Sequence, residues 1–327
     1  MNNVNCVENE IEVDSACKII KESVYQQELL KKVKYSYKIL PGNPREQILI
    51  KEGEQASAYC LSAFNYYIQN EFDFEQALAS GKHHPITGSF SIGDLATGED
   101  LMVYIDDVIP FYDRIWCITR SAGVLHRCFN LLGNTASERA FKIYSPKRSF
   151  PNEPMVGFVG TEPHRRTMSS GRGWSHGGNL DLPCIKKGSI VILPAGHRRA
   201  GVWFGDIHVT QGWGELAGVA LECSGLVKFR INRVKLIQKT KEPIIIVPKK
   251  SGLYDLYFVG CRNSFRQAIL AAAKNTIRFY PAWNAYGFID AYCELGIHGN
   301  IVIGQAVGKT VSVAIRIQTK DINHLYK

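Results

Sequence analysis

The segment KKGSIVILPAGHRRAGVWFGDIHVTQGWGE (residues 186–215) decides the fold class, because short apolar runs alternate in it with glycine and proline turns. Apolar runs this short, set between turn signals, are typical of the strands of a β-sandwich or barrel. We expect strands at 189–193 and 201–204, and the same pattern predicts others at 156–160, 217–223 and 227–236. The middle of the chain therefore predicts a mainly β fold, sandwich-like or barrel-like.

The end of the chain has a different pattern. After Pro248 the text SFRQAILAAAKNTIRFYP carries apolar residues at helical spacing, and Ser264 can cap that helix. A second helix is expected at 288–295, followed by strands in NIVIGQAV and TVSVAIRIQ. These elements predict a C-terminal α+β segment.

The domain organisation follows from these patterns. Further strands are expected at 47–50 and 101–109, with a short helix at 72–80 between them. Residues 1–45 are predicted to be an N-terminal extension, partly helical. Residues 46–327 are predicted to form one domain, with a β-rich core to about 248 and the α+β segment at 249–327.

Composition excludes several classes of protein. With 45% hydrophobic and 21% charged residues, the chain has the composition of an ordinary globular protein. It shows no apolar run of transmembrane length and no signal-like start, so we expect a cytoplasmic protein that does not bind a membrane. The nine cysteines are scattered singly, which argues against disulfides and thiolate zinc sites. The net charge of +9 is spread along the chain, so nucleic acid is not an expected partner.

A dense group of polar residues lies within this apolar region and offers metal ligands and proton carriers. Asp206 and His208 are two apart where a strand is expected to end, so both side chains can reach one ion. Mixed histidine and carboxylate ligands favour zinc, and a site richer in oxygen suits calcium or magnesium. The candidates are His176, Asn179, Asp181, Asp206, His208, Glu215 and Glu222.

Each of these residues also has a purely structural interpretation. Asp206 can be a turn residue after Gly205, His208 a buried core histidine and Glu215 a solvated charge. Asn179 and Asp181 can cap a turn. Spacing alone leaves both interpretations open.

Five segments in order resemble the acetamidase/formamidase family, over about residues 83–317. They are HPITGSFSIGDLATGEDLMVYIDDV (84–108), PMVGFVGTEP (154–163), HGGNLD (176–181), GDIHVTQGWGE (205–215) with ALE (220–222), and DAYCELGIHGNIVIGQAV (290–307). The resemblance implies metal-dependent hydrolysis of the C–N bond of a small-molecule amide, in a homodimer or higher homo-oligomer. It also implies that Asn179, Asp181, Asp206, His208 and Glu222 belong to the active site, the first four as candidate metal ligands.

A mechanism can be written for such a site. The ion would polarise the amide carbonyl and lower the pKa of a water molecule. Glu222 or Glu215 would carry the proton to the departing nitrogen, and we include His176 as a third candidate catalytic residue. Backbone N–H groups at Gly177 and Gly178 could hold the developing oxyanion.

The sequence departs from the family near the expected pocket. The family's QGDGE is QGWGE here, so Trp213 replaces a carboxylate. HRR (197–199) stands where small and apolar residues are usual, and His298-Gly299-Asn300 replaces VGD. These changes predict a specialised substrate rather than formamide or acetamide, with Trp213 stacking on it and Arg198 meeting an anion. The alternative is a non-hydrolytic biosynthetic tailoring enzyme, or a binding protein without turnover.

Overall fold

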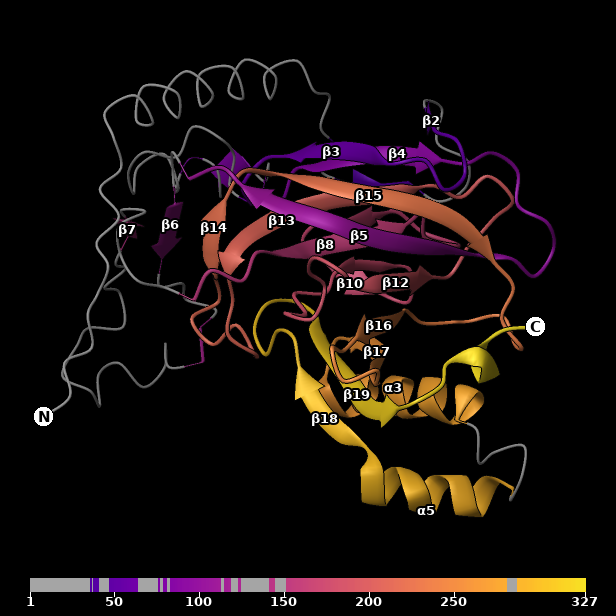
Figure 1. The fold of residues 1–327 in the computed structure, drawn as a ribbon. Helices are drawn as coiled ribbons and strands as arrows, with labels where there is room; N and C mark the ends of the chain where they lie inside the picture. The colour runs from indigo at the N-terminus through magenta and orange to yellow at the C-terminus, as the bar shows by residue number, and fades with distance from the viewer. Residues whose placement is uncertain are drawn as a thin grey trace, which may run out of the picture. The chain divides into compact units, whose positions relative to one another are not determined.

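Two β-sheets pack face to face in the protein, and helices cover the outer face of the second sheet (Figure 1). The computed structural model describes residues 36, 38–40, 47–63, 76, 79–80, 83–112, 115–118, 123–124, 141–144, 151–280 and 287–327. The predicted N-terminal extension (1–45) and the predicted helix at 72–80 lie almost entirely outside these residues. No helix in the described ranges is long and apolar enough to cross a membrane.

The first sheet has nine strands, and β13 (Val202–Thr210) is its central element. One path runs from β13 through β8 (Met155–Thr161) and β11 (Gly177–Asn179) to β10 (Gly173–Trp174). The other runs through β14 (Leu221–Cys223) and β6 (Ile115–Ile118) to β7 (Phe141–Tyr144), and β4 (Ile86–Ser91) joins β13 to β2 (Ile48–Leu49).

The second sheet has eight strands, and every pair of neighbouring strands in it is antiparallel. Its order is β18 (Asn300–Ile303), β19 (Val311–Thr319), β17 (Tyr254–Arg262), β16 (Ile244–Pro248), β12 (Ile190–Leu193), β5 (Asp100–Pro110), β15 (Gly225–Val234) and β3 (Ala56–Cys60). A separate pair is formed by β1 (Lys38–Ile39) and β9 (Met168–Ser169), and the described chain ends with the 3-10 helix η2 (Asn323–Leu325).

The core between the sheets is built by alternating side chains. The rings of Phe204 in β13 and Phe229 in β15 have centroids 4.4 Å apart, which joins the two sheets directly. In β16, Ile245 packs into this core while Ile244 and Ile246 face the other way. Strands β12, β16 and β17 are therefore buried on both faces over most of their length, which explains their continuous apolar runs, whereas β15 alternates buried and half-buried residues.

Helices α3 (Phe265–Phe279) and α5 (Phe288–His298) follow the β region, as predicted. The hydroxyl of Ser264 accepts a hydrogen bond from the backbone N–H of Gln267, so Ser264 is the N-cap of α3. Ala272 and Phe279 of α3 pack with Ile244 and Phe258 of the second sheet. This packing makes the C-terminal segment a third layer on the sandwich.

Several sequence predictions are confirmed and others are corrected by the structure. The strands expected at 101–109, 156–160, 189–193 and 227–236 are present as β5, β8, β12 and β15. The strand expected at 201–204 extends to Thr210, whereas the one expected at 217–223 is only β14. Strands β4, β16 and β17 were not predicted. The predicted mainly β class is confirmed, and the sheets of the described residues form no closed barrel, because neither strand order returns to its first strand.

Candidate metal site

The site is built on neighbouring strands of the first sheet. Asp206 and His208 lie in the middle of β13, and Glu222 of β14 is the register partner of His208. Asp181 follows β11. Strand β11 pairs with β8, and β8 pairs with β13 on the side opposite to β14. All four side chains are nearly or fully buried.

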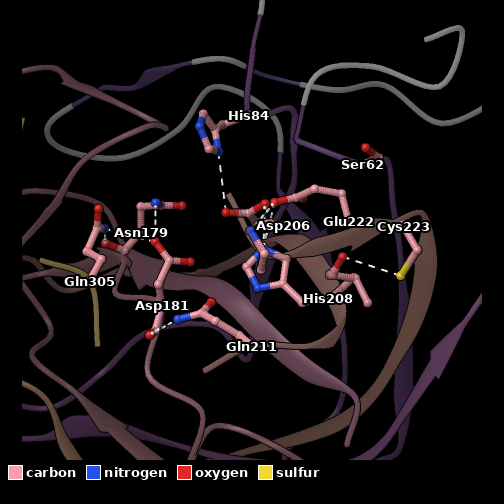
Figure 2. Close-up of polar contacts among 12 residues, drawn as sticks. Ser62, His84, Asn179, Asp181, Asp206, His208, Gln211, Glu222, Cys223 and Gln305 are labelled. Atoms are coloured by element: carbon pink, nitrogen blue, oxygen red, sulfur yellow. Dashed lines mark hydrogen bonds and ion pairs between the residues drawn. The ribbon is translucent and has the colours of Figure 1, made fainter. Parts of the chain in front are cut away.

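Polar contacts join these residues into one cluster (Figure 2). His208 Nε2 lies 3.2 Å from Oδ1 of Asp206 and 3.4 Å from Oε1 of Glu222. The second oxygen of Asp206 lies 3.3 Å from Nδ1 of His84. Asp206 is therefore held between two histidines.

Asp181 is held by two amide side chains. Asn179 Nδ2 donates to Oδ2 of Asp181 at 2.6 Å, and Gln305 Nε2 donates to the same oxygen at 2.9 Å. Gln211 Nε2 donates to the backbone oxygen of Asp181 at 2.7 Å. These bonds leave Oδ1 of Asp181 directed into the cluster (Figure 2).

Left-handed backbone conformations are concentrated at this site. His84, Asp181, Asp206 and Glu215 have φ values of 55°, 48°, 57° and 46°, and they are the non-glycine residues with positive φ in the part of the chain that the structure describes. Such conformations are costly outside glycine and persist where the surroundings impose them, often at functional sites. The concentration marks the cluster as a constrained site and not a random group of buried polar residues.

Gly157 of β8 leaves room for both aspartates. A Cβ placed on Gly157 would lie 2.5 Å from Oδ1 of Asp181 and 3.0 Å from Oδ2 of Asp206. Any larger residue would have to displace one of the two carboxylates. The glycine in PMVGFVG thus has a local reason that its sequence did not reveal.

The donor atoms fit a divalent cation. Ligand atoms of Asp181, Asp206 and His208 all lie within 4.8 Å of one another. Among the described residues, Asn179 Oδ1, Asp181 Oδ1 and Glu222 Oε2 are buried acceptors without a hydrogen-bond partner. Buried acceptors without partners are costly, and a cation at their centre would satisfy them together.

The electrostatics of the cluster point the same way. Burial, with Glu215 and Asp206 nearby, raises the pKa of Asp181 well above its usual range. Burial also raises the pKa of Asp206, but His208 and His84 outweigh it and hold that pKa below its usual range. Burial lowers the pKa of His208, and Glu222 and Asp206 more than compensate, so it ends well above its usual value. The cluster concentrates acidic groups that a cation would neutralise.

A cavity of about 270 Å³ borders the cluster. His84, Asn179 and Gln305, which contact Asp206 and Asp181, form part of its wall, and Glu215 forms another part. The remaining lining residues are His83, Ser169, Gly171, Arg172, Gly218, Val307, Gly308 and Lys309. A small molecule in this cavity would lie against the residues that hold the two aspartates.

The structure does not bring every predicted site residue to this cavity. Trp213 stacks on Tyr257, with ring centroids 6.1 Å apart, and is absent from the cavity wall. The Arg198 side chain is 75% exposed and lies 3.1 Å from Asp94. His176 is buried away from the wall, and burial lowers its pKa to about 4.

Gly177 and Gly178 serve strand packing in the structure. Both lie in β11 between β10 and β8, with φ values of 89° and 96°. A Cβ on Gly177 would lie 2.5 Å from the backbone oxygen of Val159. Their glycine character therefore has a structural cause, and their oxyanion role stays a prediction.

Sequence reasoning assigned no firm role to His84, Gln211 or Gln305, although all three touch the aspartates. His84 precedes Pro85 and resembles an ordinary loop residue in the sequence. Gln211 follows directly on the strand that carries Asp206, and Gln305 stands in a motif of the family resemblance. Their position in or next to these motifs was the sequence feature that could have indicated a role at the site.

The chain is similar in sequence to proteins of one known family. The profile of the acetamidase/formamidase family matches residues 159–276. An acetamidase of Mycolicibacterium smegmatis is 29% identical over 138 residues, which is 37% of this chain and 34% of that protein. The chain therefore matches only about a third of the length of this relative.

Solved structures show the same fold over most of the chain. An acetamidase from Yersinia enterocolitica has a TM-score of 0.76 and 22% identity, covering 89% of this chain and 90% of its own. A predicted acetamidase/formamidase from Thermoanaerobacter tengcongensis has a TM-score of 0.75 and 21% identity, covering 87% and 93%. The family profile therefore makes the chain similar to the acetamidase/formamidase family over residues 159–276, and the solved structures show that it shares their fold.

Proposed function

We propose that this protein hydrolyses the C–N bond of a small amide with the help of a divalent cation. The observation that carries the proposal is the convergence of Asp181, Asp206 and His208, with unsatisfied buried acceptors around them. The match to the acetamidase/formamidase profile over residues 159–276 supports the C–N bond of an amide as the bond that is cleaved. The cavity beside the cluster offers room for a small substrate.

Asn179, Asp181, Asp206 and His208 would hold the cation. Bound there, it would supply Lewis acidity toward the amide carbonyl and lower the pKa of a water molecule. The mixture of one histidine with carboxylate and amide oxygens suits zinc, and the high share of oxygen also admits magnesium or calcium. His84 and Gln305 act on the ligands: each fixes one aspartate through its other oxygen.

Glu222 is the best-placed proton carrier. Its Oε1 faces His208 and accepts from the backbone N–H of Ala220 at 3.3 Å, whereas Oε2 has no partner among the described residues. Oε2 can take the proton from the attacking water and pass it to the departing nitrogen. Glu215, on the cavity wall, is the second candidate for this role.

The cavity supports a substrate with an anionic end. Arg172 and Lys309 line it, and neither makes an ion pair with any described residue. A guanidinium and an ammonium beside a small cavity, without ion pairs to the described residues, favour a carboxylate or similar anion. Arg172 and Lys309, and not Arg198, are therefore the residues that we propose to bind the anionic group of the substrate.

Ammonia release tests the proposal directly. The purified protein is assayed with acetamide and with succinamate, which carries an amide at one end and a carboxylate at the other, before and after chelation. We expect ammonia release that requires the cation and is faster with succinamate. Full activity in metal-free protein would overturn the proposed role of the cation. The absence of ammonia release from any small amide would overturn the proposed hydrolysis.

Trp213 favours the second candidate, a binding protein without turnover or a non-hydrolytic enzyme, because the family has a carboxylate there. The two candidates differ in one result: saturable binding of succinamate without ammonia release identifies the second. Trp213→Asp is the matching variant, and a gain of hydrolysis in it would show that the lost carboxylate limits the reaction.

We also propose that the protein is a homo-oligomer. Phe288, Ile289, Tyr292 and Ile297 of α5 are more than half exposed and lie on one short helix. Exposed apolar surface of this kind marks interaction sites. Light scattering after size-exclusion chromatography measures the mass, and a monomer at micromolar concentration would contradict the proposal.

A further inference from the structure

A second and larger cavity, of about 550 Å³, lies between α3, the end of β17 and β10. It shares no lining residue with the cavity beside the metal site. Its wall consists of Trp174, Lys241, Glu242, Arg262, Asn263, Gln267, Leu270, Ala271, Lys274, Asn275 and Arg278. The proposed amide hydrolysis uses none of these residues.

The wall is strongly basic. It carries Lys241, Arg262, Lys274 and Arg278 against a single acidic residue, Glu242. Glu242 is already bound by Arg262, whose Nη1 lies 3.1 Å from Oε2. Lys241, Lys274 and Arg278 form no ion pair with any described residue. Burial raises the pKa of Glu242, and Arg278 lies near enough to that carboxyl to oppose the rise, so Lys241 and Lys274 are the cations without a counter-charge among the described residues.

Lys274 and Arg278 are one turn apart on the same face of α3. Like charges at this spacing repel each other and destabilise a helix, so the arrangement costs stability in the free protein. An anion bound between them would turn that repulsion into attraction. The spacing of Lys274 and Arg278 therefore lowers the stability of α3 in the free protein and favours the binding of an anion.

A buried polar group in the wall adds an independent indication. Asn275 is 2% exposed, and its Nδ2 donates to the backbone oxygen of Pro243 at 3.1 Å. Its Oδ1 has no hydrogen-bond partner among the described residues. A buried amide oxygen without a partner is costly, and a hydroxyl or N–H group of a ligand would satisfy it.

An aromatic surface closes one side of the cavity. The guanidinium of Arg262 lies 4.8 Å from the centre of the Trp174 ring, and Arg166 lies 5.4 Å from the same ring. Stacking on the indole and the bond to Glu242 fix Arg262 in position, which lowers the entropy lost on binding. The wall thus combines fixed and unpaired cations.

We propose that this cavity binds a small organic phosphate that also carries a hydroxyl or N–H donor. Lys241, Lys274 and Arg278 meet the phosphate, because three cations around one cavity match a doubly charged group better than a single carboxylate. The Oδ1 of Asn275 accepts from the donor group. A volume of about 550 Å³ holds a ligand of nucleotide-monophosphate size.

Calorimetric titration of the full chain with AMP and with inorganic phosphate tests this proposal. We expect saturable binding of AMP, weakened about tenfold or more in K274Q/R278Q because two charge-assisted contacts are removed. Arg266→Gln is the matched control: Arg266 is exposed on the same helix but outside the cavity, so AMP affinity should stay unchanged. Asp206→Asn should also keep AMP binding, which separates this cavity from the metal site.

Three results would overturn the proposal. They are the absence of saturable AMP binding, equal loss in R266Q and K274Q/R278Q, and full AMP affinity in K274Q/R278Q. Tighter binding of an oligonucleotide than of AMP, lost in K274Q/R278Q, would assign the surface to nucleic acid instead. Thermal unfolding of each variant shows that it is folded before titration.

Discussion

Nδ1 of His84 lies 3.3 Å from Oδ2 of Asp206, and both residues adopt left-handed backbone, with φ of 55° and 57°. Two costly backbone conformations thus meet in one contact at the edge of the cavity. The contact fixes one carboxylate oxygen of Asp206 and leaves the other beside His208. His84 is therefore a positioning residue of the proposed metal site.

Replacing His84 is expected to lower the affinity of the site for the cation, although His84 is not itself a proposed metal ligand. Loss of an outer partner of a metal ligand typically costs about 10–100-fold in metal affinity, so we expect a loss of that size in His84→Ala. Competition with a chromophoric chelator measures it. His164→Gln, which changes an exposed histidine whose ring contacts the backbone oxygen of Gly196, should leave metal affinity unchanged. Unaltered affinity in His84→Ala would contradict the positioning role.

Gly157→Ala tests the packing beneath the carboxylates. The added methyl group would lie 2.5 Å from Oδ1 of Asp181, so we expect displaced carboxylates and loss of most bound metal. Gly296→Ala is the control, because a Cβ there meets nothing within 4 Å. Elemental analysis of both folded variants decides the outcome; normal metal content in Gly157→Ala would show that the site adapts.

Glu222→Gln tests proton transfer separately from metal binding. General acid–base catalysis typically contributes about 10²–10⁴-fold, so kcat should fall by that range while the bound metal is retained. Glu153→Gln is the matched control, since Glu153 is exposed and pairs only with Lys186. A kcat near that of the unaltered protein would move the role to Glu215.

Arg172→Gln and Lys309→Gln test the substrate's anionic end. Each variant removes one of the two cations of the cavity wall, so KM for succinamate should rise about tenfold while acetamide kinetics change little. The ratio of kcat/KM values for the two amides is the readout. Equal effects on both substrates would indicate a structural role for these residues.

His176 should make stability depend on pH. Burial lowers its pKa to about 4 in the folded protein from 6.5, with Glu162 partly opposing the shift. The unfolded chain therefore binds a proton that the folded chain rejects, and stability should fall by about 3 kcal/mol as pH drops from 6.5 to 4.

Urea unfolding at pH 7, 5.5 and 4.5 measures this slope. His176→Gln should be less dependent on pH over that range, and His164→Gln should retain the slope. The same slope in His176→Gln and in the unaltered protein would show that His176 is not its source.

The strands and helices that the sequence predicted share a strong local signal. The run at 189–193 lies between turn residues, and Ser264 stands directly before helical periodicity. Strand β17 was missed because it begins after Pro248, where helical spacing further on suggested a change of structure. Its pairing with β16 and β19 is a tertiary property that the local text does not express.

The site was predictable as a group but not as a geometry. Asp206 and His208 converge as their spacing suggested, although the left-handed backbone of Asp206 breaks the extended pattern on which that argument rested. His84 and Gln305 come from distant segments, and only the fold brings them to the aspartates. Trp213 was expected in the pocket, but its packing on Tyr257 depends on a strand that was not predicted.

The central position of β13 has a consequence for how such proteins diversify. Asp206 and His208 are fixed by strand pairing on both sides, whereas Arg172 and Lys309 stand on connecting segments at the cavity wall. Connecting segments tolerate substitution far better than paired central strands. A few exchanges on the wall can therefore change which small molecule fits the cavity, while the paired strands that hold Asp206 and His208 stay unchanged.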